Sequence, residues 1–186
     1  MKRVCPICPR QCALEEGQIG FCRARVNRGG QIVCENYGHI TALALDPIEK
    51  KPLKRFHPGS TIFSVGSYGC NLRCPFCQNH DISMANKSGV SWENLPPEAL
   101  VARAEKLQER GCIGVAFTYN EPLVGYEYVL VCARLAKERG LMTVLVTNGM
   151  INRAPWEALL PYIDAANIDL KGFSPACYRA LDGDFE

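Results

Sequence analysis

The sequence has no long hydrophobic run and almost no excess of charge of either sign. Its 21 Lys and Arg face 19 Asp and Glu, which gives a net charge of +2, and it has only three histidines. No apolar stretch approaches the roughly 20 residues of a membrane helix, so we expect no membrane span. The near-neutral balance, without a basic and aromatic patch, gives no reason to expect nucleic acid as a partner.

The first residues also lack the apolar core of a signal peptide. Met1–Arg3 is followed at once by a segment rich in Cys and Pro, so we expect a cytoplasmic protein. The cytoplasm is reducing, and disulfides are rare there. The 11 cysteines are therefore better explained as metal ligands or packing residues than as a disulfide framework. With 47% hydrophobic and 22% charged residues, the composition is that of an ordinary globular protein.

Three cysteines form the most informative motif of the chain. Cys70, Cys74 and Cys77 are spaced C-x3-C-x2-C and follow an apolar run, Ile62–Val65, that predicts a short strand. Structural zinc sites are closed by four ligands, and ferredoxin-type clusters take four thiolates. Three thiolates on one loop therefore suggest an iron–sulfur cubane with one iron left open. The alternative is a zinc site with a fourth ligand nearby, such as His80.

The loop from Cys70 to Asn79, with aromatic Phe76 just before the last cysteine, resembles the cluster loop of the radical S-adenosylmethionine (SAM) superfamily. The resemblance implies a [4Fe–4S] cluster whose open iron binds the amino and carboxylate groups of SAM. It also implies reductive cleavage of SAM to a 5′-deoxyadenosyl radical that abstracts hydrogen from a substrate. Phe76 would then contact the cofactor, and an electron donor such as flavodoxin or ferredoxin would be a partner.

Residues 59–186 alternate short apolar strands with amphipathic helices. This pattern predicts an α/β fold with a parallel sheet covered on both faces and ligands at the carboxyl ends of the strands. The pattern contains four strand–helix units, whereas the barrel of the family has six. We therefore expect a partial (βα) barrel in a truncated chain. Such a chain should bind a cluster but turn SAM over poorly. The expected strands span residues 62–65, 113–119, 142–146 and 165–170, and the expected helices span 91–110, 122–138, 155–160 and 174–181.

Polar residues follow the second and fourth of these strands. Asn120 and Glu121, before a proline, are typical of a helix cap. In the radical SAM family this position carries a Gly-Gly-Glu-type motif that binds the SAM amino group, which implies cofactor contacts here. Asp169 and Lys171 lie two apart in a strand and share a face. They are either a buried structural ion pair or, as a similar Asp-Leu-Lys in activating enzymes implies, SAM contacts.

The N-terminal segment, residues 1–58, carries a second group of cysteines. Cys5, Cys8, Cys12 and Cys22 form C-x2-C-x3-C-x9-C among turn-forming residues. Four such ligands suit tetrahedral zinc and equally suit a second iron–sulfur cluster. The alternative is that only some of them bind a metal.

Other parts of the chain carry weaker predictions. We expect residues 31–36 and 40–45 to pair as a small ribbon beside the cysteine-rich segment. Residues 46–59 have three prolines and a basic run, and we expect them to form a solvated connector. We expect Cys34, Cys112, Cys132 and Cys177 to be packing residues.

Taken together, the motifs resemble the radical SAM enzymes of the AmmeMemoRadiSam system, a group similar to pyruvate formate-lyase-activating enzymes. The resemblance implies an oxidoreductase-like enzyme and leaves its substrate unidentified, with a protein among the candidates. Two alternatives stay open. One is an activase of a glycyl-radical enzyme, and the other is a non-catalytic zinc-ribbon interaction module.

Overall fold

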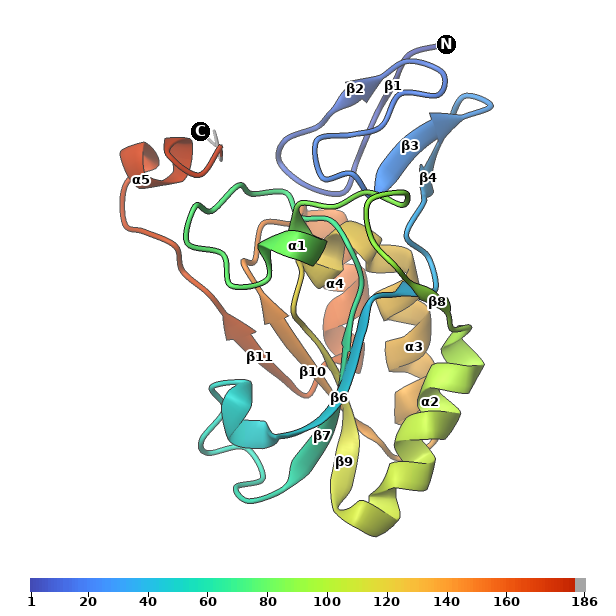
Figure 1. The fold of residues 1–186 in the computed structure, drawn as a ribbon, viewed down its shortest axis with the longest axis vertical. Helices are drawn as coiled ribbons and strands as arrows, with labels where there is room; N and C mark the ends of the chain where they lie inside the picture. Colours follow the sequence, from blue (N-terminus) through green and yellow to red (C-terminus); the bar gives the residue numbers. More distant parts are fainter. Residues whose placement is uncertain (183–186) are drawn as a thin grey trace.

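A mixed five-stranded sheet forms the centre of the computed structural model, which describes residues 1–182 (Figure 1). The sheet order is β11–β10–β9–β7–β6, and all neighbours are parallel except β6 and β7. The four parallel strands are those expected from the sequence, so the α/β prediction is confirmed. The partial barrel stays a prediction. The strands are β6 (Ala42–Pro47), β7 (Thr61–Gly66), β9 (Cys112–Phe117), β10 (Met142–Thr147) and β11 (Ala165–Ile168).

The helices between these strands pack together on one side of the sheet (Figure 1). Three of the four predicted helices are confirmed within a few residues. The first is predicted too long, because residues 91–96 are not helical and include the short strand β8 (Glu93–Asn94). Gly111, with φ of 78°, ends the first helical stretch in the left-handed conformation that glycine adopts without strain. The helical elements are α2 (Pro97–Lys106), η2 (Leu107–Arg110), η3 (Pro122–Gly125), α3 (Tyr126–Glu138), α4 (Arg153–Leu159), η4 (Leu160–Tyr162) and α5 (Pro175–Arg179).

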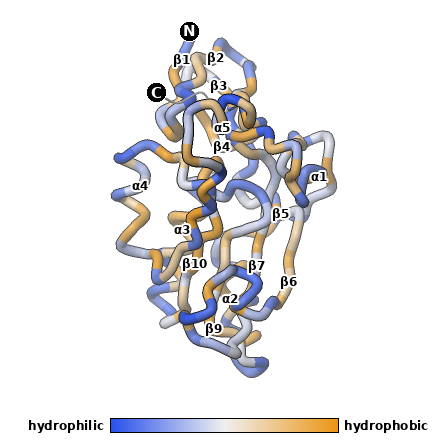
Figure 2. Tube along the Cα trace, turned by 90° about the vertical axis from the view of Figure 1, so that its left-hand side faces the viewer, coloured by the Kyte–Doolittle hydropathy of each residue, from blue (hydrophilic) through white to orange (hydrophobic). Residues whose placement is uncertain are grey.

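The two faces of the sheet are covered in different ways. Phe63, Phe117 and Leu145 pack under the helices in the main core. Ile62 and Ala116, one residue away along their strands, face the opposite side, where the connector covers them. Both faces of the sheet are therefore covered, as the sequence predicts, but the main helices lie on one face and the connector lies on the other. Figure 2 shows hydrophobic stretches along β7 and α3 and hydrophilic ones at both ends of the molecule.

The segment after β6 is more than a solvated connector, and that prediction is wrong. It forms a short helix, η1 (Ile48–Lys50), whose Ile48 is fully buried against the sheet. The side chain of Lys51 is 3% exposed and donates to Asp46 Oδ2 at 2.9 Å. Tyr119 donates its hydroxyl to the same oxygen at 2.7 Å. Burial by itself raises the pKa of Asp46, but the hydrogen bonds from Tyr119 and Lys51 outweigh it and hold the pKa well below its usual range.

A small N-terminal lobe, residues 1–36, sits beyond the carboxyl ends of the parallel strands (Figure 1). The ribbon predicted from residues 31–36 and 40–45 is wrong, because β4 pairs with β3 and residues 42–47 join the main sheet. The division into domains at residue 58 stays a prediction. The remaining short elements are β1 (Arg3–Val4), β2 (Ala13–Leu14), β3 (Arg25–Arg28), β4 (Gln31–Cys34), β5 (His39–Ile40), β8 (Glu93–Asn94) and α1 (His80–Ser83).

Most of the cysteines expected to pack do so. Cys112 and Cys132 are buried in the main core, and Cys34 is half-buried in β4. Cys177 is exposed on the short helix α5, so its prediction as a packing residue is wrong. Within residues 1–182, no helix is both long and apolar enough to cross a bilayer.

The two lysines that contact Asp46 provide a matched test of the buried ion pair. The Lys50 side chain is 67% exposed and lies 3.2 Å from the carboxylate, whereas Lys51 is buried. We expect Lys51→Ala to lower the free energy of unfolding by about 3–5 kcal/mol, because it removes the buried charged partner of the Asp46 carboxylate and leaves only the exposed Lys50 as a cation beside it. Lys50→Ala should cost less than about 1 kcal/mol. Urea unfolding of both variants measures this, and equal losses would contradict the burial argument.

Candidate active site

A cavity of about 480 Å³ opens at the carboxyl ends of the four parallel strands. Its walls come from the segments that follow β7, β9, β10 and β11. This is the edge of a parallel sheet at which ligands bind, because successive loops converge there. The cavity brings together all eight residues that the sequence singled out on residues 59–186. They are Cys70, Cys74, Phe76, Cys77, Asn120, Glu121, Asp169 and Lys171.

The three loop cysteines share one wall of this cavity. None of them is in a disulfide. The Leu72 backbone N–H donates to Cys70 Sγ at 3.4 Å, and Ser83 Oγ lies 3.3 Å from Cys77 Sγ. Burial raises the pKa of the Cys70 thiol to about 12, and a bound cation would oppose that effect.

The donor set fits an iron–sulfur cluster. Three thiols face a space far larger than one ion, and a backbone N–H and a hydroxyl group lie beside two of the sulfurs. In the described part of the chain, no three His, Cys, Asp or Glu side chains are placed so that they could hold a single metal ion. His80 is not part of the cavity wall, and its Nε2 lies 2.9 Å from Asp81.

Gly69 fixes how the cysteine loop leaves β7. Its φ is 92°, and a Cβ at this position would lie 2.4 Å from the carbonyl oxygen of Cys22 and 3.1 Å from Cβ of Ala24. Any other residue would both strain the backbone and clash with the N-terminal lobe. The loop can therefore wrap tightly between the strand and the lobe.

Asn120 holds the same loop from the other side. Its side-chain oxygen accepts from the Ser67 backbone N–H at 3.0 Å. Its amide nitrogen donates to the carbonyl oxygens of Tyr68, at 3.2 Å, and Gly69, at 3.0 Å. Both polar ends of Asn120 therefore position the backbone that precedes Cys70. A direct contact between Asn120 and the cofactor stays a prediction.

The Glu121 carboxylate is buried behind the cavity wall. It accepts from Thr147 Oγ1 at 2.7 Å, from the Asn148 N–H at 2.8 Å and from the Leu123 N–H at 3.0 Å. The last bond caps η3, as the helix-cap interpretation predicts. Burial raises the pKa of Glu121 despite these donors. The carboxylate thus ties the end of β9 to the end of β10.

Asp169 and Lys171 both line the cavity, although β11 ends at Ile168 and the two residues follow the strand rather than lie within it. Lys171 Nζ donates to Asp169 Oδ2. The two side chains are 52% and 20% exposed, respectively, so the alternative of a buried structural ion pair is wrong. Phe76 is exposed at the rim of the same cavity. A charged pair and an aromatic ring therefore remain accessible to a bound molecule.

Two residues of the site were not predicted. Asn71 accepts from Asn148 Nδ2 at 2.8 Å and donates to the Met150 carbonyl at 2.8 Å, which joins the cysteine loop to the segment after β10. Tyr119 lines the cavity with φ of 73° and reaches back to the buried Asp46. Asn71 could be recognised from the sequence, because it directly follows the first cysteine of the loop, Cys70. The conformation of Tyr119 has no signature in the sequence.

The four N-terminal cysteines lie apart from this cavity. Cys5, Cys8, Cys12 and Cys22 line a second, smaller hollow at the junction between the lobe and the sheet. The four cysteines therefore lie together, as their grouping in the sequence suggests. That they bind a metal stays a prediction.

Comparisons with known proteins agree with this site. The family model of the Radical SAM superfamily matches residues 64–185 of this chain. An uncharacterised protein of Methanocaldococcus jannaschii is 42% identical over 96% of this chain and 53% of its own length. The pyruvate formate-lyase-activating enzyme of Clostridium pasteurianum is 30% identical over 62% of this chain and 48% of its own length.

A third relative, the 7-carboxy-7-deazaguanine synthase of M. jannaschii, is 28% identical over 61% of this chain and 48% of its own length. The chain thus spans about half the length of these curated relatives. The superfamily match covers more than half of the chain, and this is sufficient to assign the class of protein. This chain belongs to the radical SAM superfamily, and it resembles the pyruvate formate-lyase-activating enzymes within it.

The role of Asn120 in holding the loop is testable by Asn120→Asp. The aspartate keeps the acceptor for Ser67 but loses the donors and places a charge beside two carbonyl oxygens. We expect a loss of about 1–3 kcal/mol in the free energy of unfolding, because the carbonyl oxygens of Tyr68 and Gly69 each lose one of their hydrogen bonds and face a new negative charge. Alkylation of Cys70 should become faster in the folded protein.

Asn86→Asp is the matched control for this variant. The Asn86 side-chain oxygen accepts from the backbone N–H groups of Ser88 and Gly89, and a carboxylate keeps both bonds. Urea unfolding and mass spectrometry of alkylated cysteines compare the two. An Asn120→Asp protein as stable as Asn86→Asp, with Cys70 equally protected, would argue against the positioning role.

Proposed function

We propose that Cys70, Cys74 and Cys77 hold a [4Fe–4S] cluster and that SAM binds beside it in the cavity. The observation that carries this is the convergence of the three loop thiols and the Asp169–Lys171 pair on one cavity at the strand ends. When bound, the cluster supplies the electron that cleaves SAM reductively to a 5′-deoxyadenosyl radical, which abstracts hydrogen from the substrate.

The chain's own residues have separate tasks in this proposal. Lys171 places a positive charge near Cys74, where it opposes the effect of burial on the thiol pKa and favours the thiolate ligand. Asp169 and Lys171 together offer an acceptor and a donor to the polar groups of SAM. Phe76 covers the rim with an apolar ring, and the buried Glu121 keeps the ends of two strands at a fixed distance.

The substrate is unidentified in this proposal, and a protein is one candidate. The similarity to pyruvate formate-lyase-activating enzymes favours a second, narrower function, in which the chain belongs to an activase of a glycyl-radical enzyme. Either function needs an external electron donor, such as flavodoxin or ferredoxin, because the chemistry consumes one electron for each SAM that is cleaved.

Anaerobic reconstitution with iron and sulfide tests the proposal. We expect a brown protein that binds iron and, when reduced in the presence of SAM, forms 5′-deoxyadenosine. Cys74→Ala should lose the iron of this cluster and all of the product, because two thiolates do not hold the cluster. Chromatography of the product and iron analysis measure both effects.

Cys177→Ala is the control for this experiment, because Cys177 is exposed and is not part of the cavity wall. It should keep the iron and the product of the unaltered chain. A Cys74→Ala protein with undiminished iron and product, or an unaltered protein that takes up only zinc, would contradict the proposed function.

A further inference from the structure

The four cysteines of the N-terminal lobe share one hollow, although they are spread over 18 positions of the chain between Cys5 and Cys22. A backbone hydrogen bond from the N–H of Cys5 to the carbonyl of Cys12, at 2.9 Å, closes the first loop. A turn from Cys8 to Gln11 brings the next thiol to the same side. None of the four is in a disulfide, and within residues 1–182 no three of them are yet placed to share one ion, so metal binding would draw the thiols closer together.

The rest of the hollow is suited to a metal centre with thiolate ligands. Ile7, Leu123, Val124 and Met150 give it apolar walls, and Cys5 and Cys22 are themselves buried. Water is a poor competitor for ligands in such surroundings. Thiolates are the soft ligands that zinc and iron–sulfur clusters prefer.

A buried positive charge also lines this hollow. Arg25 is 2% exposed, and its guanidinium is held by Glu127 at 2.6 and 2.5 Å and by the Val124 carbonyl at 2.9 Å. Four thiolates around a zinc ion or an oxidised cubane carry a net charge of about −2. Glu127 neutralises the pair as a whole, but only its Arg25 end lines the hollow, so the positive side of the pair faces the thiolates and favours the metal-bound form.

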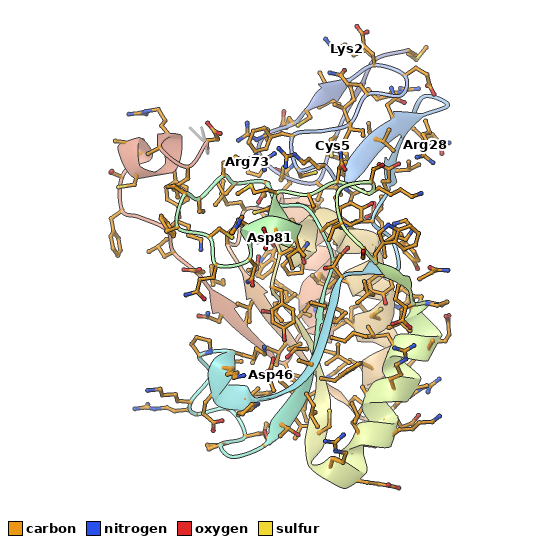
Figure 3. All side chains as sticks on the ribbon, viewed as in Figure 1. Lys2, Cys5, Arg28, Asp46, Arg73 and Asp81 are labelled. Carbon is orange, nitrogen blue, oxygen red and sulfur yellow. The ribbon has the colours of Figure 1, made fainter. Side chains whose placement is uncertain are left out.

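The hollow is built against the cysteine loop of the candidate active site. Asn71, next to Cys70, is part of its wall. Arg73 donates to the Phe21 carbonyl at 2.5 Å and lies 4.0 Å from the centre of the Phe21 ring. Figure 3 shows Arg73 and Cys5 at this junction, between the lobe and the sheet. Whatever fixes residues 20–25 therefore also fixes one side of the loop from Cys70 to Cys77.

We propose that Cys5, Cys8, Cys12 and Cys22 bind a second metal centre, zinc or an iron–sulfur cluster, that anchors the lobe behind the cysteine loop. The centre is separate from the cluster site of the proposed function, and it holds the lobe against Asn71 and Arg73. Its four thiolates close the coordination sphere, which makes the site structural rather than open to substrate.

The test uses a chain in which Cys70, Cys74 and Cys77 are all replaced by Ala, so that any tightly bound metal reports on the second site. We expect this protein, purified without oxygen, to retain close to one metal centre per chain. Iron together with sulfide identifies a cluster, and zinc without iron identifies a zinc site. Adding Cys8→Ala should remove that metal, whereas adding Cys177→Ala should leave it in place. A triple variant without bound metal would overturn the proposal.

A second measurement on the unaltered chain covers the case in which these variants do not fold. Cys8 and Cys12 are partly exposed, so alkylation can reach them when no metal is bound. We expect their alkylation to be slower by about tenfold or more before a chelator is added than after it, because metal-bound thiolates are poor nucleophiles. Cys177 should react equally fast in both. Fast alkylation of Cys8 and Cys12 before chelation would contradict the second centre, whatever the outcome of SAM cleavage.

Discussion

The close packing of Gly69 against the N-terminal lobe is the constraint on which the site depends. The backbone there is so close to the carbonyl of Cys22 that no side chain fits, and Asn120 ties down the preceding carbonyls. The cysteine loop is therefore held between the N-terminal lobe and the end of β9. Three thiols on one short loop face the same cavity because both sides of the loop are fixed in this way.

Polar groups in and behind the cavity wall hold its parts together. Glu121 joins the ends of β9 and β10, Asn71 joins the cysteine loop to the segment after β10, and Tyr119 joins the cavity to Asp46. Buried polar groups without partners are costly, so each set holds its neighbours in one arrangement. The accessible charges, Asp169 and Lys171, stand on this fixed frame. A rigid frame with a few exposed charges is what the binding of a charged cofactor requires.

The sequence predicted the repeated part of the fold well, because its strands and helices have a clear hydrophobic period. It also predicted the cavity residues, because loops at the carboxyl ends of parallel strands must converge. It failed where pairing depends on distant partners. Residues 42–47 have the pattern of a strand, but only β7 decides that they join the main sheet. Lys51 has the sequence pattern of a surface charge, because its partners Asp46 and Tyr119 are brought beside it only by the fold.

Mössbauer spectroscopy of the protein reconstituted with 57Fe, recorded with and without SAM, tests the central claim most directly. Three cysteine ligands leave one of the four irons of a cubane without a protein thiolate. The account predicts that SAM changes the signal of that iron and leaves the other three nearly unchanged. A spectrum that SAM does not alter, or a loop in which four protein ligands complete the cluster, would contradict it.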